Sequence, residues 1–325
     1  LAIALQSMDI PAASLTGAQA GSVTDSVHSK AKIRNITPKK LHAMLDAGNV
    51  TIVAGFQGET SEGHITTLGR GGSDLTAIAL ASALKADLCQ IYTDVDGVYT
   101  CDPRIVPTAK KLEEVSYDEM LELASLGAKV MQSRSVEFAK KFGVIFEVRS
   151  SLNDNPGTLV KEETQSMEGV VIRGVSLDKN QAKVTLVGVP DEPGMAARVF
   201  QQLADSTINV DMIVQNVSDH GVTDISFTVP HNDLARSVEL SERLAAEIGA
   251  TGVSSDDSIA RVSVIGAGMR TNPGVAATMF ETLSACGVNI QMISTSAIRV
   301  SCMVDGGQVE EAVRALHDTF GLAEA

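Results

Sequence analysis

The chain has 325 residues, enough for two or three domains, and its 40 acidic and 26 basic residues give a formal net charge of −14. This acidity argues against a nucleic-acid groove or a binding site for an anionic membrane surface, because both need basic patches. The longest apolar run, Leu75–Leu84, is too short to span a bilayer. The four cysteines are widely spaced and form no CxxC pair, so we expect neither a zinc site nor disulfides, and we predict a reduced, cytoplasmic environment.

The first residues of the chain are predicted to be helical. Leu1, Ala4, Leu5 and Met8 fall on one face of a helix, and no capping residue precedes them. We therefore expect this sequence to be a fragment that has lost an N-terminal piece.

The first half of the chain alternates predicted strands with predicted helices. Ser116 and Glu119 form a capping box, and Gly143 is the expected C-terminal cap of a later helix. This alternation predicts an α/β fold with a mostly parallel sheet covered by helices. The expected strands lie at 50–58, 64–69 and 88–95, the expected helices at 75–86, 116–127 and 129–142, and a polar linker at 161–169.

The second half of the chain repeats itself. "VTLVGVPDEPGMAARVFQQLADSTINVDMIVQNVS" begins at Val184, and "VSVIGAGMRTNPGVAATMFETLSACGVNIQMISTS" begins at Val262. From Pro193 and Pro273 onward the two segments run in register. Each is predicted to fold as strand, Pro-Gly turn, helix, strand, strand, helix, which is typical of a small α+β domain.

A glycine-rich turn, "TTLGRGGSD" (66–74), precedes an apolar helix. Such a turn exposes backbone N–H groups beside the positive end of the helix dipole, and Arg70 could grip a phosphate or a carboxylate bidentately. The alternative is a tight turn in which Ser73 or Asp74 is an ordinary N-terminal cap. It is not a Walker A motif, because no Gly-Lys-Ser/Thr follows.

A second polar stretch, "IYTDVDGVYTCDPR" (91–104), follows a predicted strand. Ligands of open α/β sheets bind at the carboxyl ends of strands, where this loop should lie. The alternative is a polar turn with solvated carboxylates, and Asp96 is predicted to be structural because Asp-Gly favours a turn. Lys129, at the start of a predicted helix, is either solvated or a phosphate ligand.

Several long motifs resemble those of the aspartate kinases of the amino-acid kinase family. They are "VAGFQG", "TTLGRGGSD", "YTDVDGVYTCDPR", "LGAKV" and "RSVEFA", and the Pro-Gly repeats with "INVDMIVQNVS" and "VNIQMISTS" resemble tandem ACT domains. The resemblance covers essentially the whole chain. It implies the amino-acid kinase fold, with its first strand missing, at 1–160, followed by two ACT-like βαββαβ domains at 170–258 and 259–325. Residues 170–177 are expected to pair with the second of these.

The resemblance also implies the chemistry, namely phosphoryl transfer from ATP to the side-chain carboxylate of L-aspartate. By the family pattern, the substrate is held by Arg70, Gly71, Gly72 and Ser73. Asp74, with Arg70, is catalytic, because it organises the catalytic lysine and the phosphates. Mg²⁺ is expected to bridge the phosphates of ATP, and no metal ligand from the protein is assigned. The positions that match ATP-binding residues are Thr93, Asp94, Tyr99, Arg104 and Lys129.

Two family motifs are absent from this sequence, a Lys-Phe/Tyr-Gly-Gly-Thr strand and loop and a Gly-Glu-Arg stretch. The first carries the catalytic lysine and the second a substrate-binding glutamate, so we expect residues 1–325 alone to be inactive. Two alternatives remain open. One is another amino-acid kinase, acting on acetylglutamate, uridylate or carbamate. The other is a non-catalytic amino-acid sensor built on a kinase remnant.

The repeats are predicted to bind lysine, threonine or both as feedback inhibitors, and to form a homodimer or higher homo-oligomer. Ala297 stands where the family often has glutamate, which weakens one expected contact in the second repeat. "VIGAGM" (264–269) is a poor dinucleotide fingerprint, because Thr271 replaces the third glycine. The expected effector contacts are Asp191, Gly194, Ala196, Asn209, Asp211, Gln215, Ala276, Ile290 and Gln291.

Overall fold

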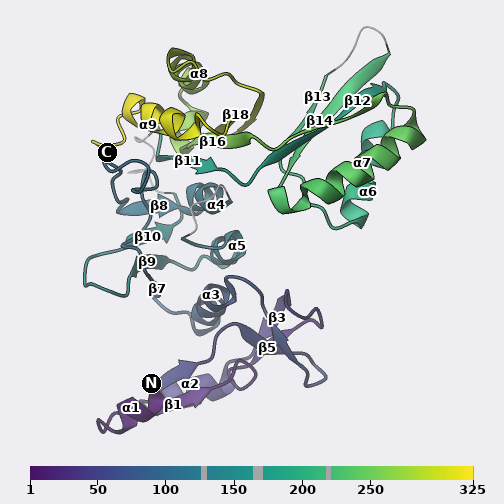
Figure 1. Cartoon of the computed structure of the whole chain (residues 1–325). Helices are drawn as coiled ribbons and strands as arrows, with labels where there is room; N and C mark the ends of the chain where they lie inside the picture. Colours follow the sequence, from purple (N-terminus) through teal and green to yellow (C-terminus); the bar gives the residue numbers. More distant parts are fainter. Residues whose placement is uncertain (126–129, 164–170, 217–220, 325) are drawn as a thin grey trace. The chain divides into compact units, whose positions relative to one another are not determined.

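The computed structural model describes residues 1–125, 130–163, 171–216 and 221–324. These residues form two compact units (Figure 1). The first unit comprises Leu1–Thr100 and Ala109–Arg173, and the second comprises Cys101–Thr108 and Gly174–Ala325.

The first unit is an α/β structure with mainly parallel strand pairs, as predicted. Its helices are α1 (Ala2–Gln6), α2 (Lys39–Asp46), α3 (Gly72–Leu84), α4 (Tyr117–Ser125) and α5 (Ser133–Phe142). Its strands are β1 (Ala12–Leu15), β2 (Ser22–Thr24), β3 (Ile33–Ile36), β4 (Val50–Val53), β5 (Gln57–Glu59), β6 (Ile65–Thr67), β7 (Cys89–Thr93), β8 (Glu114–Ser116), β9 (Phe146–Ser150) and β10 (Thr158–Lys161).

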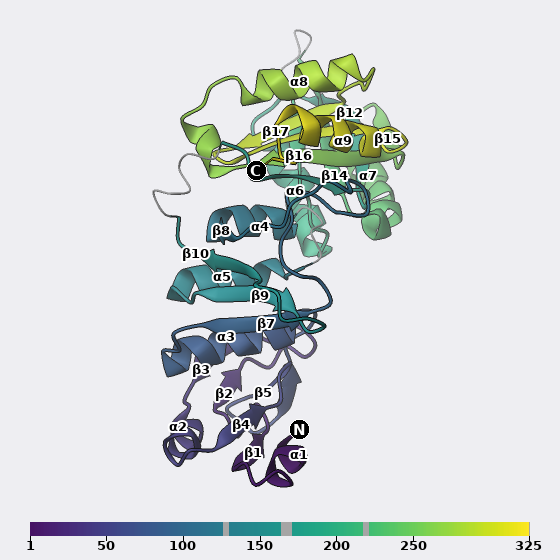
Figure 2. The same ribbon diagram turned by 90° about the vertical axis from the view of Figure 1, so that its left-hand side faces the viewer.

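These strands fall into three sheets. β1 and β4 form a parallel pair, and a four-stranded sheet has the order β7-β9-β10-β8, in which β7–β9 and β8–β10 are parallel. A small mixed sheet has the order β3-β2-β5-β6. Helix α3 packs on β7 and α5, and Figure 2 shows it lying along β7.

Helix boundaries follow local signals in the sequence. The predicted capping box is confirmed, because the Ser116 N–H donates to the carboxylate of Glu119 at 3.1 Å and the Glu119 N–H donates to the Ser116 hydroxyl at 3.3 Å. Gly143 caps α5 with a φ of 65°, also as predicted. Helix α5 begins at Ser133, four residues after the predicted start at Lys129, which lies outside the described residues.

The second unit contains two repeats of the predicted strand, helix, strand, strand, helix order. The first is β12 (Ala182–Pro190), α6 (Met195–Asp205), β13 (Ile213–Gln215), β14 (Val222–Val229) and α7 (Leu234–Ile248), followed by β15 (Gly252–Asp256). The second is β16 (Ile259–Ile265), α8 (Val275–Ala285), β17 (Met292–Ser296), β18 (Arg299–Asp305) and α9 (Val309–Thr319). Short 3₁₀ turns lie at His231–Asp233 and Ala267–Arg270.

Each repeat is built on an antiparallel four-stranded sheet. The first sheet has the order β13-β14-β12-β15, and the second has the order β11-β16-β18-β17. Strand β11 (Gly174–Asp178) precedes the first repeat in the chain but pairs with β16 of the second repeat. Phe227 and Leu186 are fully buried beneath α6 and α7, and the Phe200 ring meets Phe227 edge to face at 5.8 Å. Burying each such side chain contributes about 1.5–3 kcal/mol.

Candidate functional site

The glycine-rich turn before α3 owes its glycines to the packing of the protein itself. Gly69 and Gly71 have φ values of 82° and 69°, a region that favours glycine. A Cβ atom on Gly71 would lie 2.1 Å from Cγ of Gln132, and one on Gly72 would lie 2.9 Å from Cβ of Leu68. The backbone can therefore come this close to its neighbours only because these positions carry no side chain.

The start of α5 clamps this turn. Arg134 donates from its guanidinium to the carbonyl oxygen of Leu68 at 2.9 Å and to that of Ala31 at 2.6 Å. The Ser135 hydroxyl donates to the carbonyl oxygen of Gly71 at 3.3 Å. Sequence reasoning assigned no role to Arg134 or Ser135, although both lie in the quoted stretch "RSVEFA", because their partners are between 64 and 103 residues away in the chain.

The loop after β4 braces the turn from another direction. The Thr76 hydroxyl donates to the Gly72 carbonyl at 2.7 Å and accepts from the Phe56 N–H at 3.1 Å. Phe56 has a φ of 71°, which is rare for a residue other than glycine. A ring atom of Phe56 lies 3.0 Å from where a Cβ of Gly72 would be. Phe56 is thus a second residue of this site that sequence reasoning missed, and its place between two glycines was the available signal.

The turn leaves its polar side chains accessible. Arg70 and Ser73 are exposed, whereas Asp74 is half-buried in the first turn of α3. The alternative in which Ser73 or Asp74 caps the helix is wrong, because the N-terminal cap is Gly71 and both residues lie inside α3. Burial raises the pKa of Asp74 above its ordinary value, and the Asp74 carboxylate is one reason, after burial, that the pKa of Cys89 in β7 rises to about 11.

A separate group of predicted site residues lies at the carboxyl end of β7. The Thr93 hydroxyl donates to the Asp94 carboxylate at 3.2 Å, and the Thr93 carbonyl accepts from the Ser151 hydroxyl at 3.0 Å. Tyr99 is half-buried, and burial, followed by the charge of Asp96, raises the pKa of its phenol.

Asp96 and Arg104 are both tied to neighbouring side chains. Asn153 donates its amide to the Asp96 carboxylate at 2.8 Å, which agrees with a structural role for Asp96. Arg104 belongs to the second unit, where its exposed guanidinium forms an ion pair with Asp102 at 2.6 Å. The contact with Asp102 uses Nε and one terminal nitrogen of Arg104, so the other terminal nitrogen keeps its N–H donors. Lys129 lies outside the described residues.

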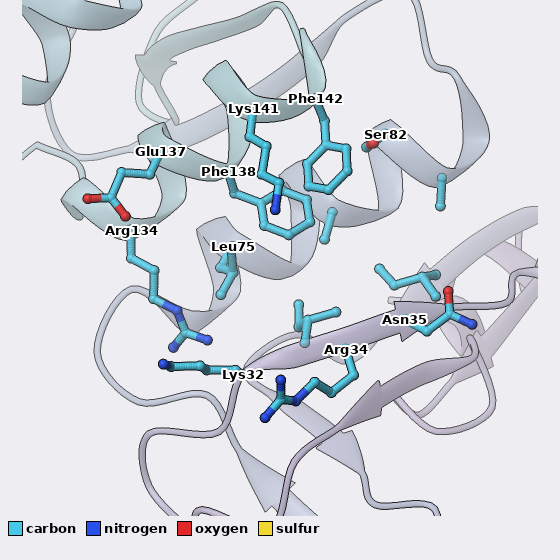
Figure 3. A pocket seen from close by; sticks show the side chains of 14 residues that line it. Lys32, Arg34, Asn35, Leu75, Ser82, Arg134, Glu137, Phe138, Lys141 and Phe142 are labelled. Carbon is cyan, nitrogen blue, oxygen red and sulfur yellow. The ribbon is translucent and has the colours of Figure 1, made fainter.

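A hollow of about 820 Å³ opens between β3, α3 and α5 (Figure 3). Its floor is apolar, with Leu75 and Phe138, and basic side chains such as Lys32 and Lys141 stand at its edge. The hollow is lined by α3 and α5, the two helices that contact the glycine-rich turn, but the predicted site residues are not part of its lining.

The described part of the chain contains no group of three or more His, Cys, Asp or Glu side chains that could hold a metal ion. Mg²⁺ keeps several waters and needs only one or two carboxylates when phosphates supply the remaining oxygens. Asp74 is therefore a suitable single carboxylate, and the residues present fit an ion that arrives with the phosphates. Within the same described residues, no helix is both long and apolar enough to cross a membrane.

The Pro-Gly turns of the two repeats have matching geometry. Gly194 and Gly274 are the N-terminal caps of α6 and α8, with φ values of 99° and 107°, and the space around both is open. Asp191, which donates its N–H to the Gly221 carbonyl at 2.9 Å, is exposed beside the first turn, and Ala196 lies within α6.

Except for Ala276, which lies in the first turn of α8, the remaining expected effector positions lie on the edge strand β13 or just before β13 and β17. Asn209, Gln215 and Gln291 are exposed, whereas Ala276 and Ile290 are half-buried. Asp211 and Gln291 already have partners, because Asp211 forms an ion pair with Arg261 and Gln291 accepts a hydrogen bond from Lys183.

Comparison with known proteins agrees with this architecture. The model of the amino acid kinase family matches residues 1–146, and an ACT domain model matches residues 184–242 and 262–320. An aspartokinase of Mycolicibacterium smegmatis is 50% identical over 99% of this chain and 78% of its own length.

Two solved structures of E. coli aspartokinase III also match. One is in complex with aspartate and ADP (TM-score 0.79, 30% identity), and the other is in complex with lysine and aspartate (TM-score 0.76, 31% identity). Each match covers 97% of this chain and 71% of the other. The chain, with its kinase-type first unit and its two ACT-like repeats, belongs to the aspartokinase family.

Proposed function

We propose that this protein is an aspartate kinase, which transfers the γ-phosphoryl group of ATP to the side-chain carboxylate of L-aspartate to give 4-phospho-L-aspartate. The observation that carries the proposal is the glycine-rich turn, clamped by α5, that presents an exposed arginine and serine at the start of α3. The aspartokinase relatives, one of them solved with aspartate and ADP, support L-aspartate as the substrate.

The substrate half of the site needs positioning rather than proton transfer. Arg70 holds a carboxylate of L-aspartate bidentately, and Gly71, Gly72 and Ser73 bring backbone and hydroxyl donors to the same anion. The attacking carboxylate is ionised at pH 7, so it needs no general base. The half-buried Asp74, whose pKa is raised by burial, orients the cationic groups that surround the phosphates.

The nucleotide half of the site is assigned to Thr93, Asp94, Tyr99, Arg104 and Lys129. Asp74 is the carboxylate of the protein that would hold a Mg²⁺ ion arriving with ATP, and this ion would supply positive charge to the phosphates. Residues 1–325 contain no Lys-Phe/Tyr-Gly-Gly-Thr stretch, so we also propose that they bind the substrates without turning them over.

The repeats are proposed to carry feedback regulation by lysine, threonine or both. The open Pro-Gly turns at Gly194 and Gly274 expose helix N-terminal N–H groups that suit the α-carboxylate of an amino acid. The relative solved with lysine and aspartate supports an amino-acid effector. Edge strands β13 and β17, which carry the exposed Ile213 and Ile293, are the proposed surfaces of a homodimer.

The test is a calorimetric titration of L-aspartate into this chain in the presence of Mg²⁺ and a non-hydrolysable ATP analogue. We expect saturable binding that weakens about 10- to 100-fold in Arg70→Ala, which is the range for losing a charge-assisted contact. Arg34→Ala, which removes another exposed arginine of the same unit, should bind like the wild type. Equal binding by Arg70→Ala would contradict the assignment. Binding of lysine or threonine without any binding of aspartate would favour the amino-acid sensor.

A further inference from the structure

The two repeats meet at an apolar junction inside the second unit. Met212, at the approach to β13, packs with Ile259, Met292 and Met303 of the second repeat, and Val214 packs against this group. Met212 and Met292 occupy equivalent positions of the two repeats, 80 residues apart. The junction therefore includes one pair of equivalent positions from the two repeats.

Polar and charged residues at the junction also occupy equivalent positions of the two repeats. Arg261 faces Asp178 in the β11–β16 ladder, and its guanidinium contacts the carboxylates of Asp178, at 3.2 Å, and of Asp211 in the first repeat. We call Arg261, Asp178 and Asp211 the first arm of the junction. A second arm has the matching arrangement, in which a basic residue faces an aspartate of its own sheet and contacts a side chain of the other repeat. Its members are Lys183, Asp256 and Gln291.

The two arms differ in strength. The Arg261 side chain is only 3% exposed, and it contacts two carboxylates, those of Asp178 and Asp211. In the other arm, the Lys183 ammonium donates at 2.8 Å to a neutral amide, that of Gln291, at the surface. A buried guanidinium between two carboxylates interacts more strongly than an exposed ammonium with a neutral amide, so the contacts of Arg261 dominate the junction.

Asp211 links this junction to a second feature. It lies between Asn209 and Gln215, on the exposed face of the first repeat to which effector contacts are assigned. We propose that Arg261 couples this face to the second repeat, so that an amino-acid ammonium group arriving at Asp211 opposes the Arg261 contact and loosens the junction. The opposition follows from charge, because the ammonium and the guanidinium have the same sign and share one carboxylate. The ligand half of this inference rests on the proposed effector function, whereas the coupling itself does not.

Amide hydrogen exchange of the whole chain tests the coupling without a ligand. Arg261→Met keeps an unbranched apolar side chain, and Lys183→Met is the matched control in the weaker arm. We expect exchange in peptides covering 209–215 to rise several-fold in Arg261→Met and to stay unchanged in Lys183→Met. Reciprocally, Asp211→Asn, on the first repeat, should raise exchange in 259–265. If Arg261→Met does not fold, Arg261→Lys keeps the charge without the planar fork, and the rise at 209–215 should be smaller but present.

An unchanged 209–215 segment in a folded Arg261 variant, or an equal rise in Lys183→Met, would overturn the coupling. Titration of L-lysine and L-threonine tests the ligand half, since Arg261→Met should bind the effective amino acid several-fold more tightly than the wild type. Unchanged or weaker binding would overturn the proposed competition. If neither amino acid binds the wild type, the effector function fails, and the exchange data still decide whether Arg261 couples the repeats.

Discussion

Replacing Gly71 by alanine should destabilise the first unit more than the same change at another left-handed glycine. Two costs arise at Gly71. A non-glycine residue at a φ of 69° costs about 1–2 kcal/mol. The new Cβ would also lie 2.1 Å from Cγ and 2.5 Å from Cβ of Gln132. A change of rotamer can move Cγ but not Cβ, so the turn or the start of α5 must shift, at about 1–3 kcal/mol for overpacking.

Gly143→Ala separates these two costs. Gly143 has a φ of 65°, close to that of Gly71, and a Cβ there would meet no atom within 4 Å. Both changes also reduce the freedom of the unfolded chain equally, which opposes part of the loss in each. We therefore expect Gly71→Ala to lower the free energy of unfolding by about 1–3 kcal/mol more than Gly143→Ala does.

Urea unfolding followed by tyrosine fluorescence is the assay. The chain has three tyrosines and no tryptophan, and Tyr92, Tyr99 and Tyr117 all lie in the first unit, so the signal reports on the unit that contains both glycines. Gln132→Gly removes the obstructing atoms, so in that background Gly71→Ala should cost about as much as Gly143→Ala costs in the wild type. Equal losses in the two single variants would refute the contact between the turn and α5 that defines the candidate site.

Three further predictions concern a cap, a half-buried carboxylate and the thiols. Ser116→Ala removes the N-terminal cap of α4 and should cost about 0.5–2 kcal/mol in the same unfolding assay, whereas a change below 0.3 kcal/mol would contradict the capping box. Asp74→Asn should raise the free energy of unfolding at pH 7. The folded-state pKa of Asp74 lies above its ordinary value of 3.8, so the cost of its ionised form appears as the pH rises above that value and is absent below it. A gain of the same size at pH 3 and pH 7 would contradict the desolvation of Asp74. Cys286 should be the one thiol that a maleimide modifies rapidly at pH 7.5, as measured by mass spectrometry of peptides. The other three thiols, those of Cys89, Cys101 and Cys302, are buried, and burial raises the pKa of each. Fast labelling of any of these three would contradict their burial.

Features with a local physical cause could be predicted from the sequence. The capping box at Ser116 and the C-terminal cap at Gly143 depend on residues within a few positions of one another, and both are confirmed. The repeat of the second half was visible because Pro-Gly at 193 and 273 sets the same strand-to-helix turn twice, and α6 and α8 both begin directly after it. The identity of the family also followed from the sequence, because several long motifs occur in order.

Features that depend on distant partners could not be predicted. The glycine-rich turn was interpreted as space left for an anion, whereas Gln132 and Arg134 show that its backbone is also packed tightly against α5. Asp211 was assigned to an effector's ammonium group, and its ion pair with Arg261, 50 residues away, was not foreseen. In both cases the missing information was which surfaces pack together. The spacing of residues along a short stretch of sequence does not reveal this.

The proposed reaction is the phosphorylation of L-aspartate at the turn that carries Arg70. The most direct measurement uses the product of the complete reading frame, with ATP, Mg²⁺ and hydroxylamine to trap the acyl phosphate as a hydroxamate. We predict ADP release and hydroxamate in equal amounts that require L-aspartate, and a loss of at least ten-fold in kcat/KM in Arg70→Ala but not in Arg34→Ala. No aspartate-dependent ADP release, or full activity in Arg70→Ala, would contradict the account.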